Sequence, residues 1–255
     1  MAPSPVVQSP TLSPDAAYFY QQLSPYGRWL LADDNQWYWQ PSVATATWQP
    51  YSDQGHWVYT DSGWYWASDY PWGWAAFHYG RWRLHPLHGW MWLPDRVWGP
   101  GWVTWRTSGD YCGWAPLPPG AYFDTAGVLV FRGRHVAVDF DFGLDWHHFS
   151  FCRVREMGEP HFVALRREAD RRMAFSRTTV LNHYTVNRTV VEGRTEMRFI
   201  NHGIEPGRVA AVKGRTIETV RIQELHTPAP KGAHERFDRN QKTLEVYRPR
   251  WGDQH

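Results

Sequence analysis

The side chains with the clearest chemical potential in this sequence are its aromatic rings, above all the indoles. The chain has 255 residues and contains 18 Trp, 13 Tyr and 12 Phe. Exposed Trp and Tyr rings can stack on the C–H faces of sugars, or can enclose a quaternary ammonium group by cation–π attraction. The same rings can instead form the core and the contacts between repeats. Five rings outside the repeated Trp pairs are the candidates for ligand binding: Tyr38, Tyr51, Tyr65, Trp72 and Tyr79.

The polar residues offer little that resembles a catalytic or metal site. His147 and His148 follow Asp145, but adjacent residues on a strand face opposite ways, so both are poor ligands for one ion. We expect a polar loop or strand edge there. There is no nucleophile elbow, phosphate-cradling glycine loop or HExxH motif. A glycosidase needs two carboxylates across a cleft, and the Asp residues before residue 121 fit turns. We expect no catalytic residues, no metal and no cofactor.

Cys112 and Cys152 are the two cysteines of the chain, so at most one intramolecular disulfide can form. An exported location would permit this bond, which would connect the Trp-rich part of the chain to the region that follows. The alternatives are two buried thiols or an unpaired loop cysteine. Spacing alone does not decide between them, because a disulfide requires a specific geometry.

The elements that must position the aromatic rings belong to a repeated unit. Each unit consists of Gly-x-Trp, six or seven further residues, and Trp-x-Trp. The leading glycines are Gly27, Gly55 and Gly80, and a degenerate fourth unit covers residues 102–116. Such self-similarity at short spacing indicates a structural repeat.

Each repeat predicts a β-hairpin. In the unit GHWVYTDSGWYW we predict strands over residues 56–60 and 64–67, with the turn at 61–63, because Asp-Ser-Gly is typical of tight turns between β-rich runs. One hairpin is marginally stable by itself. Three or four of them must therefore pack on a common core.

The alternation of side chains along a strand assigns the faces of this hairpin. Trp64 and Trp66 share one face, and Trp57 can lie opposite them on the partner strand. The equivalent Trp pairs of the other units identify this face as the repeated one. We therefore expect Trp57, Trp64 and Trp66 to be buried. Tyr65 should face outward, as the better candidate for a binding platform.

Composition divides the chain near residues 116–120. Sixteen of the 18 Trp lie between Trp29 and Trp114. Residues 1–120 contain five Arg, eight Asp and neither Lys nor Glu, whereas the remainder contains 22 basic and 17 acidic residues. These shifts predict four segments: a disordered Pro/Ser-rich linker over 1–16, a Trp-rich β-repeat domain over 17–120, a β-rich region over 121–225, and a flexible linker with a closing strand over 226–255.

The second half of the chain is also predicted to be mainly β. Residues 128–143 alternate around an Arg-Gly-Arg turn, which predicts a hairpin, and residues 178–204 and 207–224 are typical of strands. One helix is possible near 161–175. Its arginines could meet an anionic polymer, although such clusters usually form a solvated helix face. The predicted fold class is all-β, with antiparallel hairpin repeats and a β-rich C-terminal extension.

Charge and hydropathy exclude several classes of partner. The formal net charge is +2, so no overall field favours nucleic acid or an acidic membrane. No apolar stretch is long enough for a transmembrane helix. The N-terminal run MAPSPVVQSPTLSP lacks the basic region and apolar stretch of a signal peptide. We expect an exported protein whose targeting segment is absent from this sequence.

The combined motifs resemble a known family. The runs YGRW, WYWQP, GHWVYTDSGWYW, WAAFHYGRW, GWMWLPD and CGWAPLPPG closely resemble a bacterial family called domain of unknown function 6600. The resemblance covers about residues 17–123, and the tail, with TVLNHYTVNRTVVEG and KTLEVYRP, is similar to the C-terminal part of some members. Members often follow a FecR-type domain in exported envelope proteins, but this chain contains no FecR-type segment. The resemblance implies a fold and an exported location, and no activity.

The sequence therefore predicts a non-enzymatic module of the bacterial envelope, periplasmic or at the cell surface. The leading hypothesis is that it binds a glycan or another surface polymer through exposed aromatic rings. The alternative is a structural or assembly protein whose aromatic residues and tail pack against protein partners. Glycan binding predicts a row of exposed rings, whereas assembly predicts exposed strand edges and self-association.

Overall fold

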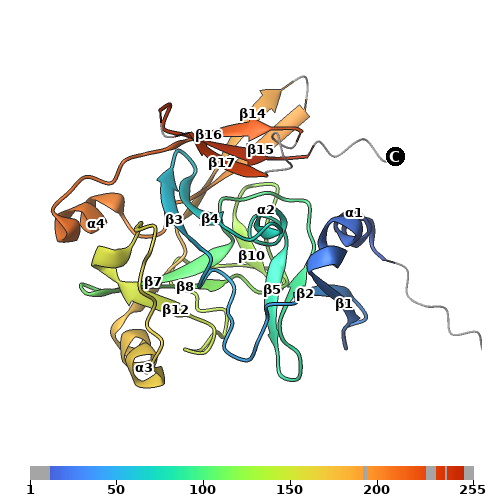
Figure 1. Ribbon diagram of the computed structural model, residues 1–255, viewed down its shortest axis with the longest axis horizontal. Helices are drawn as coiled ribbons and strands as arrows, with labels where there is room; N and C mark the ends of the chain where they lie inside the picture. Colours follow the sequence, from blue (N-terminus) through green and yellow to red (C-terminus); the bar gives the residue numbers. More distant parts are fainter. Residues whose placement is uncertain (1–11, 192–193, 228–233, 239, 250–255) are drawn as a thin grey trace, which may run out of the picture.

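The computed structural model describes residues 12–191, 194–227, 234–238 and 240–249, and its architecture is mainly β, as predicted (Figure 1). Over these residues 18 strands accompany four α-helices. None of the helices within the described ranges is both long enough and apolar enough to cross a membrane.

The Trp-rich units form four antiparallel hairpins. They are β1 (Gly27–Leu31) with β2 (Trp37–Pro41), β3 (Gly55–Thr60) with β4 (Gly63–Ser68), β5 (Arg81–His85) with β6 (Gly89–Leu93), and β7 (Val103–Thr107) with β8 (Tyr111–Pro116). Each hairpin places two indoles directly opposite one another: Trp29 and Trp39, Trp57 and Trp66, Trp82 and Trp92, Trp105 and Trp114. Each repeat is therefore a hairpin in which a Trp on one strand pairs with a Trp on the other.

The predicted hairpin of β3 and β4 is confirmed, but its loop is one residue shorter than the predicted turn at 61–63, because Gly63 begins β4. Thr60 pairs with Gly63, which leaves a two-residue loop. The Thr60 hydroxyl accepts a hydrogen bond from the Ser62 N–H at 3.1 Å and donates one to the Gly63 carbonyl at 2.8 Å. Gly63 has a φ of 77°, which a residue with a side chain rarely adopts. Local chemistry thus fixes the turn and the register.

The leading glycine of each unit leaves room for an indole on the partner strand. A Cβ atom added to Gly27 would lie 2.7 Å from Nε1 of Trp39, and one on Gly80 would lie 2.8 Å from Nε1 of Trp92. On Gly55 it would lie 2.9 Å from Cε2 of Trp66. These separations are far below van der Waals contact. The Gly-x-Trp…Trp-x-Trp pattern is therefore a packing motif, in which the last Trp lies across the first Gly.

The hairpins combine into sheets that cross the predicted domain boundary. One sheet has the order β1-β2-β6-β5; the others add strands from beyond residue 121. These are β14-β15-β4-β3, with β14 (Tyr184–Val191) and β15 (Arg194–Asn201), and β12-β8-β7-β13, with β12 (Ser150–Arg153) and β13 (Thr179–Leu181). A small sheet β11-β10-β9 contains β9 (Ala121–Phe123), β10 (Leu129–Phe131) and β11 (Arg134–His135), and β10 with β11 forms the predicted hairpin. The two halves share sheets, so the composition shift near residue 120 does not separate them structurally.

A three-stranded C-terminal sheet completes the fold. Its order is β16-β18-β17, with β16 (Arg221–Leu225), β17 (Glu235–Asp238) and β18 (Thr243–Tyr247). In Figure 1 it lies at the top, in red, over β3, β4 and the short helix α2 (Gly73–Ala76). The closing strand is confirmed as β18. Residues 235–238, predicted to be linker, instead form a strand that pairs with it.

The helices correct three details of the prediction. The helix expected at 161–175 is observed as α3 (Glu168–Arg177). The residues before it run alongside β12 instead, where the Leu165 N–H donates to the Phe151 carbonyl at 2.7 Å. Residues predicted as strand form α4 (Pro206–Lys213), which begins with Pro206 and ends at Gly214 with a φ of 67°. Helix α1 (Pro14–Leu23) begins inside the predicted linker, where Ser13 caps it. The 3-10 turns η1 (Ser24–Tyr26) and η2 (Val154–Glu156) follow α1 and β12 respectively. Residues 1–11 lie outside the described ranges.

One aromatic core joins the four hairpins, as expected. Trp39, Trp57, Trp64, Trp66, Trp92, Trp105 and Trp114 are each less than 2% exposed. Several of their indole N–H groups donate to backbone carbonyls: Trp39 to Leu23, Trp64 to Ile204, Trp92 to Tyr79 and Trp114 to Tyr51, at 2.7–3.0 Å. Most of the indoles are therefore structural, and the predicted burial of Trp57, Trp64 and Trp66 is confirmed.

Candidate functional site

None of the five aromatic candidates presents its ring to solvent. Tyr38, Tyr51, Tyr65 and Tyr79 are at most 1% exposed, and Trp72 is 3% exposed. The Tyr51 hydroxyl donates to the Phe77 carbonyl at 2.8 Å, and the Trp72 ring stacks on Tyr70 with centroids 4.5 Å apart. In this fold these residues cannot be open sugar platforms.

The prediction that Tyr65 faces outward is wrong, although the side of the strand on which its side chain lies was predicted correctly. Tyr65 does point away from the Trp64/Trp66 face, but the opposite face of β4 is covered as well. Its ring stacks on His78, with centroids 4.3 Å apart, and Glu235 of β17 lies nearby. Burial, followed by the Glu235 charge, raises the pKa of Tyr65 far above its usual value. Alternation places a side chain on a face; it does not say whether that face is solvated.

The surface around Tyr65 is an aromatic platform, which we define as Tyr65, Trp74, His78, Tyr79 and Trp98. The C-terminal sheet covers it. His234 stacks on Trp74 with ring centroids 4.7 Å apart and planes 11° from parallel, and Tyr247 packs edge-on against the same indole at 5.2 Å. The Arg248 guanidinium lies 4.6 Å from the Trp98 ring centroid. Two of the five candidates, Tyr65 and Tyr79, thus do belong to a platform, but the chain itself occupies it.

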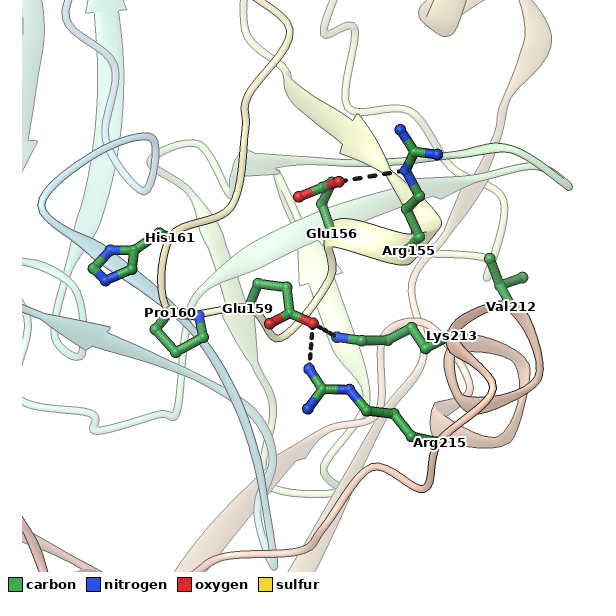
Figure 2. Close-up of a pocket in the computed structure, with 8 residues that line it drawn as sticks. All are labelled: Arg155, Glu156, Glu159, Pro160, His161, Val212, Lys213 and Arg215. Carbon is green, nitrogen blue, oxygen red and sulfur yellow. Dashed lines mark hydrogen bonds and ion pairs between the residues drawn. The ribbon is translucent and has the colours of Figure 1, made fainter.

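A separate pocket lies between the loop after β12 and the end of α4. Figure 2 shows its lining side chains: Arg155, Glu156, Glu159, Pro160, His161, Val212, Lys213 and Arg215. Its volume is about 530 Å³. Gly214 ends α4 in the left-handed conformation, so the chain reverses and Arg215 lies beside Lys213 at the pocket.

An ion-pair network forms one wall of this pocket. Lys213 Nζ lies 2.5 Å from Glu159 Oε1 and donates to the Met157 carbonyl at 2.8 Å; its side chain is 4% exposed. Arg215 pairs with the same carboxylate oxygen. Hydrogen bonds from Lys213 and then Arg215 lower the pKa of Glu159. The carboxylate is therefore ionised and neutralised, and Lys213 is held in place.

Two arginines, Arg155 and Arg215, lie exposed at the rim of the pocket. The Arg155 side chain is 71% exposed and pairs with its neighbour Glu156 at 3.4 Å. Arg215 is 63% exposed. In the view of Figure 2 they lie on opposite sides of the Glu159–Lys213 pair. Three permanent cations against two carboxylates give the pocket a net positive charge, which suits an anionic group.

The cysteines lie side by side beneath this region. Cys112 of β8 and Cys152 of β12 are direct cross-strand partners. Both thiols are free and buried, with Sγ atoms 3.3 Å apart. Burial, with a hydrogen bond from the Cys152 thiol to Cys112, raises the pKa of the Cys152 thiol well above its usual range. The predicted partners are therefore adjacent, but they are not bonded in this structure.

The histidine pair and the arginine cluster seen in the sequence form hydrogen bonds and ion pairs with neighbouring residues. Nδ1 atoms of His147 and His148 approach the Asp145 carboxylate at 3.2 and 2.8 Å in a loop. Arg171 donates to three carbonyls of the same loop, and Arg172 pairs with Glu168 at 2.8 Å. Across the described part of the chain, no group of three His, Cys, Asp or Glu is arranged to hold a metal ion.

Comparison with known families adds one finding. Residues 20–121 match the family of unknown function DUF6600. This segment belongs to that family. No curated protein and no solved structure matches the chain. The association with FecR-type domains stays an expectation from the resemblance.

The two candidate regions differ in their relation to the DUF6600 segment. The platform lies inside it, whereas the C-terminal sheet that covers the platform and all pocket residues lie outside it. Sequence reasoning missed the pocket, because its halves are about 55 residues apart and neither carries a motif. It also missed His78 and Glu235. The one local signal for His78 was its place in WAAFHYGRW, among residues of the repeated core.

Proposed function

We propose that the protein is a non-enzymatic binding module of the bacterial envelope, and that its pocket between η2 and α4 binds an anionic group of an envelope polymer. The exported location comes from the family resemblance. The observation that carries the proposal is the pair of exposed guanidinium groups, Arg155 and Arg215, on either side of a fixed Lys213. Guanidinium groups bind carboxylates and phosphates in bidentate geometry.

This proposal changes the binding surface that the sequence suggested. The rings expected to bind sugars are buried, so recognition by aromatic stacking loses its support. An anionic polymer needs cations instead, and the chain after residue 120 carries five more basic than acidic residues. None of the residues that line the pocket is a Ser, Thr or Cys that could serve as a nucleophile.

The proposal is tested by titrating the protein with a polyuronate and with a neutral glucan of equal length, at low and at physiological salt. We expect binding of the polyuronate alone, weakened by salt because exposed charges are screened. Arg155→Ala combined with Arg215→Ala should weaken it roughly 5- to 30-fold, at about 0.5–1 kcal/mol for each exposed charge. The polymer should keep its length on incubation, as size-exclusion chromatography would show.

A matched control is the pair Arg166→Ala and Arg172→Ala, which removes the same charge from the region of α3. Arg172 is 58% exposed and lies outside the pocket. This control should bind polyuronate like the parent. Equal losses in both double variants would mean that net charge alone drives binding and would contradict a pocket. Binding of the neutral glucan with equal affinity would also contradict the proposal.

The alternative function, packing against protein partners, draws on a different observation. The aromatic platform of the DUF6600 segment is covered by a peptide segment from outside it, through contacts of His234, Glu235 and Tyr247. A surface that accepts one peptide strand in this way is suited to protein recognition.

A further inference from the structure

The centre of the aromatic platform contains a group of buried polar atoms around His78, which we call the recess. His78 is 1% exposed, and its Nδ1 lies 2.9 Å from the Gly99 carbonyl oxygen. Its other ring nitrogen, Nε2, lies 3.3 Å from Oε1 of Glu235. The second carboxylate oxygen, Oε2, lies 3.4 Å from the backbone N–H of Ser68. Tyr65 forms the floor, because its ring stacks on the imidazole.

The groups that line this recess can donate hydrogen bonds to a carboxylate, His78 Nε2 only when the imidazole carries a proton on both nitrogens. A carbonyl can only accept, so His78 Nδ1 carries a proton. Nε2 then faces a carboxylate, and the two attract only if a proton lies between them. The Tyr65 hydroxyl and the Ser68 N–H can also donate. The recess is therefore suited to an acceptor that carries negative charge, in surroundings where an unpaired donor is costly.

Glu235 fills this recess imperfectly. The Tyr65 hydroxyl and His78 Nε2 are both buried without a hydrogen bond of ordinary geometry, although the carboxylate lies beside them. Oε1 of Glu235 is likewise without one. Native proteins satisfy most buried polar groups. These buried groups therefore depend on Glu235, held on β17, for a polar partner.

The recess and its occupant come from different parts of the chain. Tyr65, Ser68 and His78 lie within the segment that matches DUF6600, whereas Glu235 lies more than 100 residues beyond its end. The indole walls, Trp74 and Trp98, also lie in the matched segment. The receptor residues therefore lie within the segment that matches the family, and their occupant is supplied by the chain that follows.

We propose that the DUF6600 domain carries a receptor site for a single carboxylate presented by an extended peptide strand, and that this chain occupies the site in cis with Glu235. Tyr65, His78 and the Ser68 N–H face the carboxylate, Trp74 packs against His234 immediately before it, and Trp98 packs against Arg248. An acidic peptide from another protein would use the same donors. This site is distinct from the pocket between η2 and α4.

The test empties the site in the full-length chain and refills it with a small probe. Glu235→Ala removes the carboxylate and leaves the donors unpaired. Sodium acetate should then raise the melting temperature of this variant in a saturable manner. A concentration tenfold above the dissociation constant should give about 3–6 °C for a chain of this size. Wild type, whose site is filled, should show no rise beyond that produced by sodium chloride.

Two controls separate carboxylate recognition from cavity filling. Acetamide has the shape of acetate without its charge, and should not stabilise Glu235→Ala. The double variant Glu235→Ala, His78→Phe lacks the imidazole donor, and acetate should not stabilise it beyond chloride. The proposal is overturned if acetamide acts as well as acetate, or if acetate stabilises wild type and variant equally.

A variant that does not fold in chloride also gives a result. In that case Glu235→Ala is refolded in acetate, and recovery of its native near-ultraviolet dichroism supports the site. Failure to refold in acetate overturns the proposal. These outcomes are independent of polyuronate binding, because the residues that line the pocket are left unchanged.

Discussion

Replacing Gly55 with Ala tests whether the glycine of the repeat is a packing residue. The added Cβ would lie 2.6 Å from the Ala67 carbonyl oxygen and 2.9 Å from Cε2 of Trp66. Neither atom can move easily, because one belongs to the paired strand and the other to an indole with 0% exposure. Overpacking of this kind costs about 1–3 kcal/mol. The smaller entropy of the unfolded chain returns about 0.4–1 kcal/mol.

With the middle of each range the net loss should be about 1.3 kcal/mol, a fall of roughly 3–5 °C in melting temperature at this chain length. Denaturant and thermal melts followed by Trp fluorescence would measure it. Gly109→Ala is the matched control, because a Cβ there meets nothing within 4 Å and the φ is not in the left-handed region. That variant should be neutral or slightly stabilised.

A second substitution tests the cause. Trp66→Phe removes the part of the indole that meets the new Cβ, so the loss from Gly55→Ala should be smaller in the Trp66→Phe background than in the parent. The packing argument is refuted if Gly55→Ala is as stable as Gly109→Ala. It is also refuted if the two substitutions at Gly55 and Trp66 are simply additive, because atoms in direct contact must show coupling.

Three further predictions follow from the buried groups. Tyr65→Ala should cost about 3–5 kcal/mol of unfolding free energy, as for a large core ring, and a denaturant melt close to the parent would contradict its burial. Cys112 and Cys152, 40 residues apart, should bond when the chain folds under oxidising conditions, before burial protects their thiols. Thiol titration in denaturant should then find none free, and reduction should cost up to about 4 kcal/mol; two free thiols would contradict this. Burial lowers the pKa of His234 below its ordinary 6.5, so the unfolded chain takes up the proton first and stability should fall as the pH drops below 6.5. His234→Gln should make the pH dependence of the melting temperature shallower than in wild type, and identical profiles would show that this imidazole is not buried against Trp74.

The sequence by itself determined the hairpins and their core face. All the signals for one hairpin lie within about a dozen neighbouring residues: the Gly-x-Trp and Trp-x-Trp spacing, the turn residues, and the alternation of side chains along each strand. Because turn chemistry and alternation are local, they predicted that Trp57 can lie opposite the Trp64/Trp66 pair; the structure sets the register, in which Trp57 pairs with Trp66. They also identified the Trp face as buried, since a repeated apolar face must pack on its neighbours.

The tertiary structure alone decided what covers the other faces. Tyr65 lies on the face that the sequence left to solvent, yet Glu235 of β17 closes over it, and β17 is joined to β4 through a contact 167 residues apart in the chain. The pocket arises in the same way, from Glu159 and Lys213 on elements with no shared pattern. Alternation divides a strand into two faces, but burial depends on which distant segment packs on each. Which segment packs on each face depends on the contacts of the whole chain. The spacing of residues within one hairpin carries no information about it.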